Sequence, residues 1–299
     1  MLMQFQRDHL ETLLAAVDEG TFDAAAARLN ITASAVSQRI KTMEQAAGRI
    51  LLRRTTPVRP TADGEVVVRH ARQARLLEQE TARALDPAGD GQVPSIPLAV
   101  NADSLATWFL DALTDVLEDT AVVFDLFRED QDRTSDLLRS GTVMAAVTAE
   151  AAPVQGCSSV RLGTMRYHAV ASPSFVDRHL NGHPGTGGLD GVPLVDFDRQ
   201  DSLQQAFLRS VVGHEPRSPR HFVPTSEDFA RAIRMGFGWG MLPDQQCLDD
   251  LAAGRLIALA PERPASVVLH WQRWKLASPL LDRVTRAVRE VAGQELLTS

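Results

Sequence analysis

The stretch from residue 21 to residue 60 constrains this chain most, because it holds two short helical patterns separated by a tight break. The apolar side chains of the first pattern recur at the spacing of one helix face: Phe22, Ala25, Ala26 and Leu29. Asn30 and Ile31 interrupt it, and the hydroxyl of Thr32 can cap the start of a second helix. In that helix Val36, Ile40 and Met43 share one face. The pattern predicts two helices that pack through their apolar faces.

The outward faces of the second helix carry hydroxyl, amide and cationic groups. Gln pairs with adenine and Arg with guanine in two-bond geometries, while Ser and Lys hold phosphate. This is the chemistry of a helix-turn-helix whose second helix enters a major groove. Arginines after Gly48 predict a two-stranded wing over residues 49–60 that contacts the DNA backbone. The expected DNA contacts are Thr32, Ser34, Ser37, Gln38, Arg39, Lys41, Arg53, Arg54 and Arg59.

The same stretch resembles the N-terminal domain of LysR-type transcriptional regulators. The resemblance rests on D-x-G-T-F-x-x-A-A-x-x-L-x-I-T-x-S-A-V-S-Q-R-I-K-x-M-E at residues 18–44. It continues as G-x-x-L-L-x-R at 48–54 and R-P-T-x-x-G at 59–64. A match this dense over about 65 residues, in its expected context, favours DNA binding over a hairpin that only packs.

The distribution of charge agrees with DNA binding although the total does not. The formal net charge of the 299 residues is −7, yet residues 26–60 hold seven basic side chains and one acid. An acidic protein with one basic face binds DNA locally. No leader with an apolar core opens the sequence and no run of about 18 apolar residues occurs, so we expect a cytoplasmic protein. Cys157 and Cys247 are predicted to be buried or idle thiols.

Residues 62–85 form a long helical pattern, too long for one small domain. At 1.5 Å per residue such a helix spans roughly 36 Å, so its apolar stripe needs a partner. The stripe is formed by Val66, Val67, His70, Gln73, Ala74, Leu77 and Ala84. In the family the equivalent helix pairs two subunits, which implies a homodimer or homotetramer. A cluster of Pro, Gly and Asp at 86–91 predicts a hinge.

From residue 94 strands and helices alternate, which predicts a parallel sheet. Strands are expected at 96–100, 122–127 and 142–147, with helices at 104–117 and 132–139. A second unit is expected from residue 167, with strands at 167–171, 221–224 and 239–242 and helices at 203–210 and 226–235. The chain then returns through a strand at 267–271 and a helix at 279–292. The resemblance implies that these lobes form a periplasmic-binding-protein-like effector domain.

Ligands of parallel α/β lobes bind beyond the carboxyl ends of the strands, against helix N-termini. Such ends are predicted near residues 100–104, 147–150, 196–198 and 224–227. Helix N-termini suit a carboxylate, and acids around them suit a cation, so the pattern favours a basic amino acid held at both ends. The expected effector contacts are Asn101, Asp103, Ser104, Thr148, Glu150, Asp196, Asp198, Ser226 and Glu227. Each of them can also be a plain helix cap or a surface group.

Further matches resemble the lysine- and arginine-responsive branch of the family: residues 52–61, V-N-A-D-S-L-A-T-W-F-L at 100–110, F-D-x-x-D-x-x-x-Q-A-F-L at 197–208 and S-E-x-F at 226–229. The resemblance implies control of an amino-acid exporter gene by lysine, arginine or histidine. It also implies that the promoter-bound protein meets RNA polymerase. Two alternatives stay open: a LysR-type regulator with another small effector, and an architectural DNA binder that responds to no effector.

An enzyme with a DNA-binding appendage is disfavoured. No Gly-rich phosphate loop occurs, the histidines lack metal-ligand spacing, and Ser172 and Ser174 lack the setting of a nucleophile. We therefore expect no catalytic residue, metal or cofactor, and no membrane partner. The predicted architecture is an α+β multidomain chain: a winged helix-turn-helix at 1–61, a linker helix and hinge at 62–91, and a two-lobed α/β effector domain at 92–299. Lobe I is expected at about 92–165 and 267–299, and lobe II at about 166–266.

Overall fold

The computed structural model describes residues 5–86, 93–128 and 131–298. Its N-terminal domain contains α1 (Arg7–Asp18), α2 (Phe22–Leu29), α3 (Ala33–Ala47) and a wing of β1 (Leu52–Arg53) and β2 (Arg59–Pro60). The predicted helix-turn-helix is confirmed, with the expected cap at Thr32 and a further one at Thr21. The hydroxyl of Thr21 accepts from the N–H of Ala24 at 3.1 Å, and that of Thr32 from the N–H of Ala35 at 3.2 Å. Gly48, at φ 61°, ends α3.

The core of this domain is built from the predicted apolar faces. Val36, Ile40 and Met43 of α3 are fully buried against α1 and the wing. Glu44 fixes the start of the wing, because its Oε1 accepts from the backbone N–H groups of Leu51 and Leu52 at 2.9 and 3.3 Å. Ile50, just before them, is 69% exposed and takes no part in this core.

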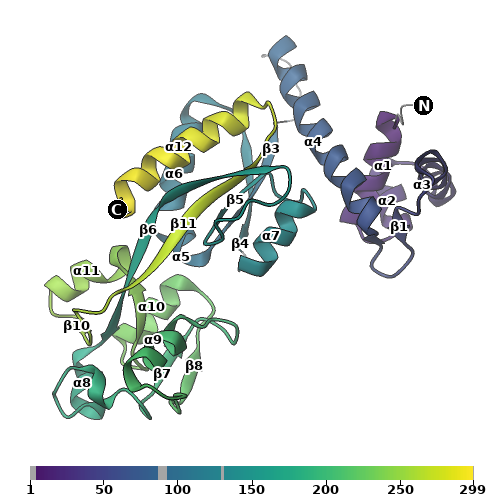
Figure 1. Ribbon diagram of the computed structural model, residues 1–299. Helices are drawn as coiled ribbons and strands as arrows, with labels where there is room; N and C mark the ends of the chain where they lie inside the picture. The colour runs from purple at the N-terminus through teal and green to yellow at the C-terminus, as the bar shows by residue number, and fades with distance from the viewer. Residues whose placement is uncertain (1–4, 87–92, 129–130, 299) are drawn as a thin grey trace.

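The linker helix α4 (Ala62–Leu85) has the predicted bounds and joins the two halves of the molecule (Figure 1). It packs against α1 at one end, and Leu76 enters the core of the effector domain. Farther along, Oε1 of Glu80 accepts from Ser278 Oγ at 2.7 Å and from the N–H of Leu280 at 2.9 Å. Glu80 of α4 therefore caps the start of the C-terminal helix at Pro279–Glu295, and these hydrogen bonds hold α4 against the effector domain. Of the predicted hinge at 86–91, residues 87–91 lie outside the described residues.

The effector domain is organised by one seven-stranded sheet in the order β10-β6-β11-β5-β3-β4, with β9 also paired to β6. Its strands are β3 (Ser95–Val100), β4 (Val123–Arg128), β5 (Ala145–Thr148), β6 (Cys157–Ala171), β9 (Gly240–Pro243), β10 (Ile257–Ala258) and β11 (Ala265–Trp274). β3 lies parallel to β4 and β5, as the alternating pattern predicts. A separate parallel pair is formed by β7 (Leu194–Asp196) and β8 (Arg220–Phe222).

Two long antiparallel strands connect the lobes. β6 has fifteen residues and β11 ten, and they pair from Ala265↔Tyr167 to Trp274↔Cys157. Figure 1 shows both running from lobe I into lobe II. The prediction at 167–171 found only the end of β6, because in the preceding residues Val160, Leu162 and Met165 are separated by polar or small side chains and form no apolar run. The expected strand at 142–147 was also misplaced, since β5 begins at Ala145.

Helices cover the sheet in both lobes. Lobe I carries a continuous helical run, α5 (Ala102–Ser104), η1 (Leu105–Phe109) and α6 (Leu110–Asp119), with α7 (Gln131–Arg139) and α12 (Pro279–Glu295). Lobe II carries α8 (Pro173–His179), the short 3-10 helix η2 (Thr186–Gly188), α9 (Leu203–Val212), α10 (Ser226–Arg234) and α11 (Asp244–Ala252). The sequence reading missed α8 and α11, which are short. Cys157 and Cys247 are both buried. Among the described residues, no helix combines the length and apolar composition that crossing a bilayer requires.

Candidate reader helix and interlobe cavity

The exposed side of α3 carries the polar groups that the sequence assigned to the major groove. Ser34, Gln38 and Lys41 are exposed, and Ser37 is half-buried. Thr32 stands at the N-cap, where its hydroxyl also contacts Ser34 Oγ at 2.9 Å. The helix therefore presents an amide, hydroxyls and an ammonium group on one accessible side. These groups suit base edges and phosphates.

Arg39 takes a different direction from the one expected. Its guanidinium lies against α1, where it donates to Thr12 Oγ1 at 3.2 Å and to the carbonyl of Asp8 at 3.5 Å. It also pairs with the Asp8 carboxylate at 3.5 Å. Arg39 thus ties the reader helix to the domain core and is not grouped with the outward side chains.

The wing gathers cationic side chains at the edge of the domain. Arg53 and Arg59 face each other in the β1–β2 register, and both are exposed. Arg54 is exposed as well, with its guanidinium over the ring of Phe22 at 5.9 Å. Cation–π contact holds a guanidinium near the start of the reader motif without neutralising it. The three arginines supply the positive charge that backbone binding needs.

A cavity of about 560 Å³ lies between the two lobes of the effector domain. Lobe I contributes residues that follow β3 and β5, and lobe II contributes the segment from Phe197 to α9. The hinge strands form its floor through Tyr167, Val267 and Leu269. Among the residues that the structure describes, three of the lining residues are aspartates, Asp103, Asp198 and Asp201, and none is Lys, Arg or His. The cavity is therefore acidic and sized for a small molecule.

Asp103 connects the two lobes at this cavity. Its Oδ1 accepts from Ser226 Oγ of lobe II at 2.7 Å, and its Oδ2 accepts from the Tyr167 hydroxyl at 2.8 Å. Burial raises the pKa of Asp103, the two hydrogen bonds lower it, and the nearby charge of Asp201 raises it further. Burial likewise raises the pKa of Tyr167 well above its ordinary value. A cation beside Asp103 would offset this cost of ionisation.

Asn101, Asp103, Thr148 and Asp198 line the cavity, as the sequence predicted. Oδ1 of Asp198 accepts from the N–H groups of Gln200 and Asp201 at 2.7 and 2.9 Å, which shapes the loop before α9. Oδ1 of Asn101 is buried and has no hydrogen-bond partner among the described residues. A buried acceptor without a donor favours a ligand that brings N–H groups.

Five other expected contacts do not line the cavity. Ser104 is fully buried inside the helical run, and Ser226 stands behind Asp103. Asp196 is buried in β7, where it pairs with Arg220. Glu150 accepts from Ser135 Oγ at 2.6 Å, and Glu227 is exposed in the first turn of α10. Ser226, Asp196 and Glu150 are thus held by other side chains, and Ser104 and Glu227 are not among the lining residues.

The sequence reading missed several lining residues, above all Tyr167, Phe197, Asp201 and Gln204. Asp201 caps the start of α9, since its Oδ1 accepts from the N–H of Leu203 at 2.9 Å. That capping position was readable from the sequence, because an acid two residues before a helical pattern is a start signal. Tyr167 could not be found from strand ends, because it lies within β6, which begins ten residues before the predicted start.

Comparison with known proteins agrees with both halves of this architecture. Residues 7–65 match the family described as bacterial regulatory helix-turn-helix protein, lysR family, and residues 91–293 match the LysR substrate binding domain. The chain belongs to the LysR family. As a member, it is a DNA-binding transcription regulator and not an enzyme.

The full length of the chain is similar to regulators of one branch of that family. The lysine export transcriptional regulatory protein LysG of Corynebacterium glutamicum is 43% identical over 292 residues, covering 96% of this chain and 98% of LysG. Full-length LysG from the same organism, solved with bound effector Arg, superposes with a TM-score of 0.81 at 40% identity, covering 98% and 100%. ArgP from Mycobacterium tuberculosis superposes with a TM-score of 0.87 at 41% identity, covering 99% and 100%.

Proposed function

We propose that this LysR-type regulator binds a basic amino acid, lysine or arginine with histidine as the third candidate, in its interlobe cavity and thereby controls an amino-acid exporter or related gene. The observation that carries the proposal is the charge of the lining, which holds three aspartates and no basic side chain in the described part of the chain. An ammonium or guanidinium group would form charge-assisted hydrogen bonds with these carboxylates, which an uncharged side chain cannot form.

The two ends of the ligand meet different chemistry. The cationic side chain would lie near Asp198 and Asp201 of lobe II, and the α-ammonium group near Asp103 and the unpaired Asn101 Oδ1 of lobe I. The α-carboxylate would face the N-terminus of the helical run that starts at Ala102, where backbone N–H groups are free. The similar LysG structure with bound arginine supports this ligand class.

Regulation then follows from the hinge strands. A ligand that touches both lobes favours their closed arrangement, which is an ordinary hinge motion. We propose that two chains pair through the exposed side of α4, which includes Val66, His70 and Leu77, and that closure changes how paired reader helices meet DNA. Val67, assigned to the same stripe by sequence, is buried in the N-terminal domain core. The pairing follows the family, and it sets the spacing of two half-sites.

DNA recognition is proposed to divide between the two elements of the N-terminal domain. Ser34, Ser37 and Gln38 would read bases, whereas Lys41 and the arginines of the wing would hold phosphates. The protein would act at promoters, where it meets RNA polymerase, and hence in the cytoplasm. The domain limits at 61 and 91 remain part of this proposal.

Calorimetric titration tests the effector assignment directly. The full-length protein is titrated with L-lysine, L-arginine and L-histidine, and with L-leucine as a matched uncharged control. Saturable heat from basic amino acids alone supports the proposal. Heat from leucine and not from the basic amino acids would favour a LysR-type regulator with another effector.

A DNA-binding titration separates the remaining alternative. The affinity for a fragment upstream of a candidate exporter gene, and for an unrelated fragment of equal length, is measured at fixed salt with and without the amino acid. A regulator prefers the first fragment and changes its affinity or footprint when the ligand is added. Equal binding to both fragments, with no ligand effect, would indicate an architectural DNA binder.

A further inference from the structure

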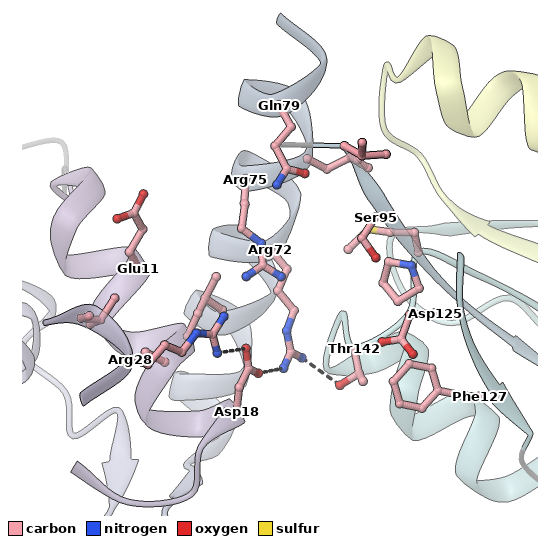
Figure 2. Close-up of a pocket in the computed structure, with 17 residues that line it drawn as sticks. Glu11, Asp18, Arg28, Arg72, Arg75, Gln79, Ser95, Asp125, Phe127 and Thr142 are labelled. Carbon is pink, nitrogen blue, oxygen red and sulfur yellow. Dashed lines mark hydrogen bonds and ion pairs between the residues drawn. The ribbon is translucent and has the colours of Figure 1, made fainter. Parts of the chain in front are cut away.

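A second cavity, of about 580 Å³, lies outside the interlobe site, between the DNA-binding domain and lobe I. We call it the interdomain cavity. Its walls come from α1 and α2 on one side, α4 in the middle, and β3, β4 and the segment just before β5 on the other (Figure 2). Three guanidinium groups line it, from Arg28, Arg72 and Arg75.

Two of these arginines are neutralised within the protein. Arg72 pairs with Asp18 Oδ1 at 2.8 Å and donates to Thr142 Oγ1 at 2.8 Å, so it joins the DNA-binding domain to lobe I. Arg28 lies 3.5 Å from the other oxygen of Asp18 and 3.2 Å from Glu19. One carboxylate, Asp18, thus serves two guanidinium groups (Figure 2).

Arg75 is the third arginine of the cavity, and it has no carboxylate partner of this kind among the described residues. It stands one helical turn after Arg72 on α4, and Figure 2 shows its guanidinium facing the cavity beside those of Arg28 and Arg72. No hydrogen bond or ion pair is found for it among the described residues. Burial lowers the pKa of Arg75, and the charges of Arg72 and Arg28 lower it further, against the opposing effect of Asp18 and Glu11. A partly buried guanidinium without a partner is costly.

The other acids of the cavity do not supply that partner. Glu11 pairs with Arg7 at 3.0 Å, and Asp125 stands on the opposite wall, on lobe I (Figure 2). The cationic side of the cavity is therefore the α4 wall. Gln79 lies one turn beyond Arg75 on the same wall and offers an amide N–H₂ group. This combination, a guanidinium fork with an adjacent amide donor, matches the geometry of an oxyanion.

We propose that the interdomain cavity binds a small oxyanion, a carboxylate or a phosphate, through Arg75 and Gln79. Such an anion neutralises the surplus guanidinium at a place where the DNA-binding domain, the linker helix and lobe I meet. It is a ligand of opposite charge to the proposed effector and occupies a different cavity. Its binding therefore favours the arrangement in which the DNA-binding domain is docked on lobe I.

Calorimetry on the full-length protein tests the site, with inorganic phosphate and succinate as probes and chloride used to hold ionic strength constant. Wild-type protein should bind one anion per chain, and the stronger of the two probes tells phosphate from carboxylate chemistry. Arg75→Gln should weaken that binding at least about tenfold, because a two-bond charged contact is lost. Arg83→Gln on the same helix, with the same change of charge but outside the cavity, should bind as wild type.

Failure of the proposal is equally visible. Absence of saturable binding by both anions, or equal binding by wild type and Arg75→Gln, would overturn it. Arg75→Lys keeps the charge without the fork and should give intermediate affinity, which guards against a folding defect in the first variant. Titration of Arg75→Gln with L-arginine should match wild type, so the anion site and the interlobe site are tested separately.

Discussion

Replacing Asp103 by Asn tests the interlobe cavity at its central group. The substitution keeps the size of the side chain but removes a carboxylate that accepts hydrogen bonds from Ser226 and Tyr167. An amide offers one oxygen, so one of the two hydroxyl donors loses its acceptor. A cationic group of the ligand also loses Asp103, a lobe I carboxylate that lines the cavity.

The substitution should lower the affinity for arginine strongly but change the free energy of unfolding little. A hydrogen bond to a charged group contributes about 1.5–3 kcal/mol, so arginine affinity should fall by about 10- to 150-fold. The free energy of unfolding should change little, by about 1 kcal/mol or less. The reason is that burial raises the pKa of Asp103, and removing a poorly solvated charge offsets the lost hydrogen bond.

The assay combines arginine calorimetry with urea unfolding of the unliganded protein. Ser226→Ala is the matched control, since it breaks the same interlobe hydrogen bond but Ser226 does not line the cavity. It should reduce arginine affinity less than Asp103→Asn does. Because ligand binding requires the ionised carboxylate, wild-type affinity should also rise with pH through the raised pKa of Asp103, and the variant should lose this dependence.

Arginine binding of wild-type strength by Asp103→Asn would refute the contact. A loss of unfolding free energy as large as the loss of binding free energy would also refute it, since the variant would then report a damaged fold and not a missing ligand partner.

Three further variants test other parts of the structure. Gln38→Ala should relax preference at one base pair by about 1–3 kcal/mol in competition binding, whereas uniform weakening on all sequences would contradict a reading role. Burial raises the pKa of Asp196 in the folded protein to about 6. The folded protein therefore binds a proton more tightly than the unfolded chain, and the stability that this proton contributes is present at pH 4 and lost as pH rises through 6. Relative to Asp196→Asn, wild-type unfolding free energy should fall by about 1–3 kcal/mol over that range, and parallel pH curves would count against this. Gly64→Ala would place a Cβ 1.9 Å from the Leu51 carbonyl oxygen. The free energy of unfolding should therefore fall by about 1–3 kcal/mol, and a thermal melting curve identical to that of the wild type would contradict this.

The sequence by itself determined the local elements of this protein. Thr32, Gly48 and the bounds of α4 were predictable because a cap or a helix end depends on residues within one turn. The family was readable for the same reason, since its motif lies in one continuous stretch. The sequence also predicted part of the acidic lining of the interlobe cavity, Asp103 and Asp198, because the strand ends of parallel sheets meet at one edge.

The tertiary structure alone decided which of those groups meet. Asp103 contacts Ser226 across 123 positions, while Asp196, in the same predicted set, turns to Arg220. Arg39 contacts α1 and not the outward side of its own helix. Arg75 is one of several charged residues of α4, and only the packing of α1 and lobe I around that helix places it at a cavity. Pairings over such separations depend on the register of β6 and β11 and on how the domains dock, which no local pattern encodes.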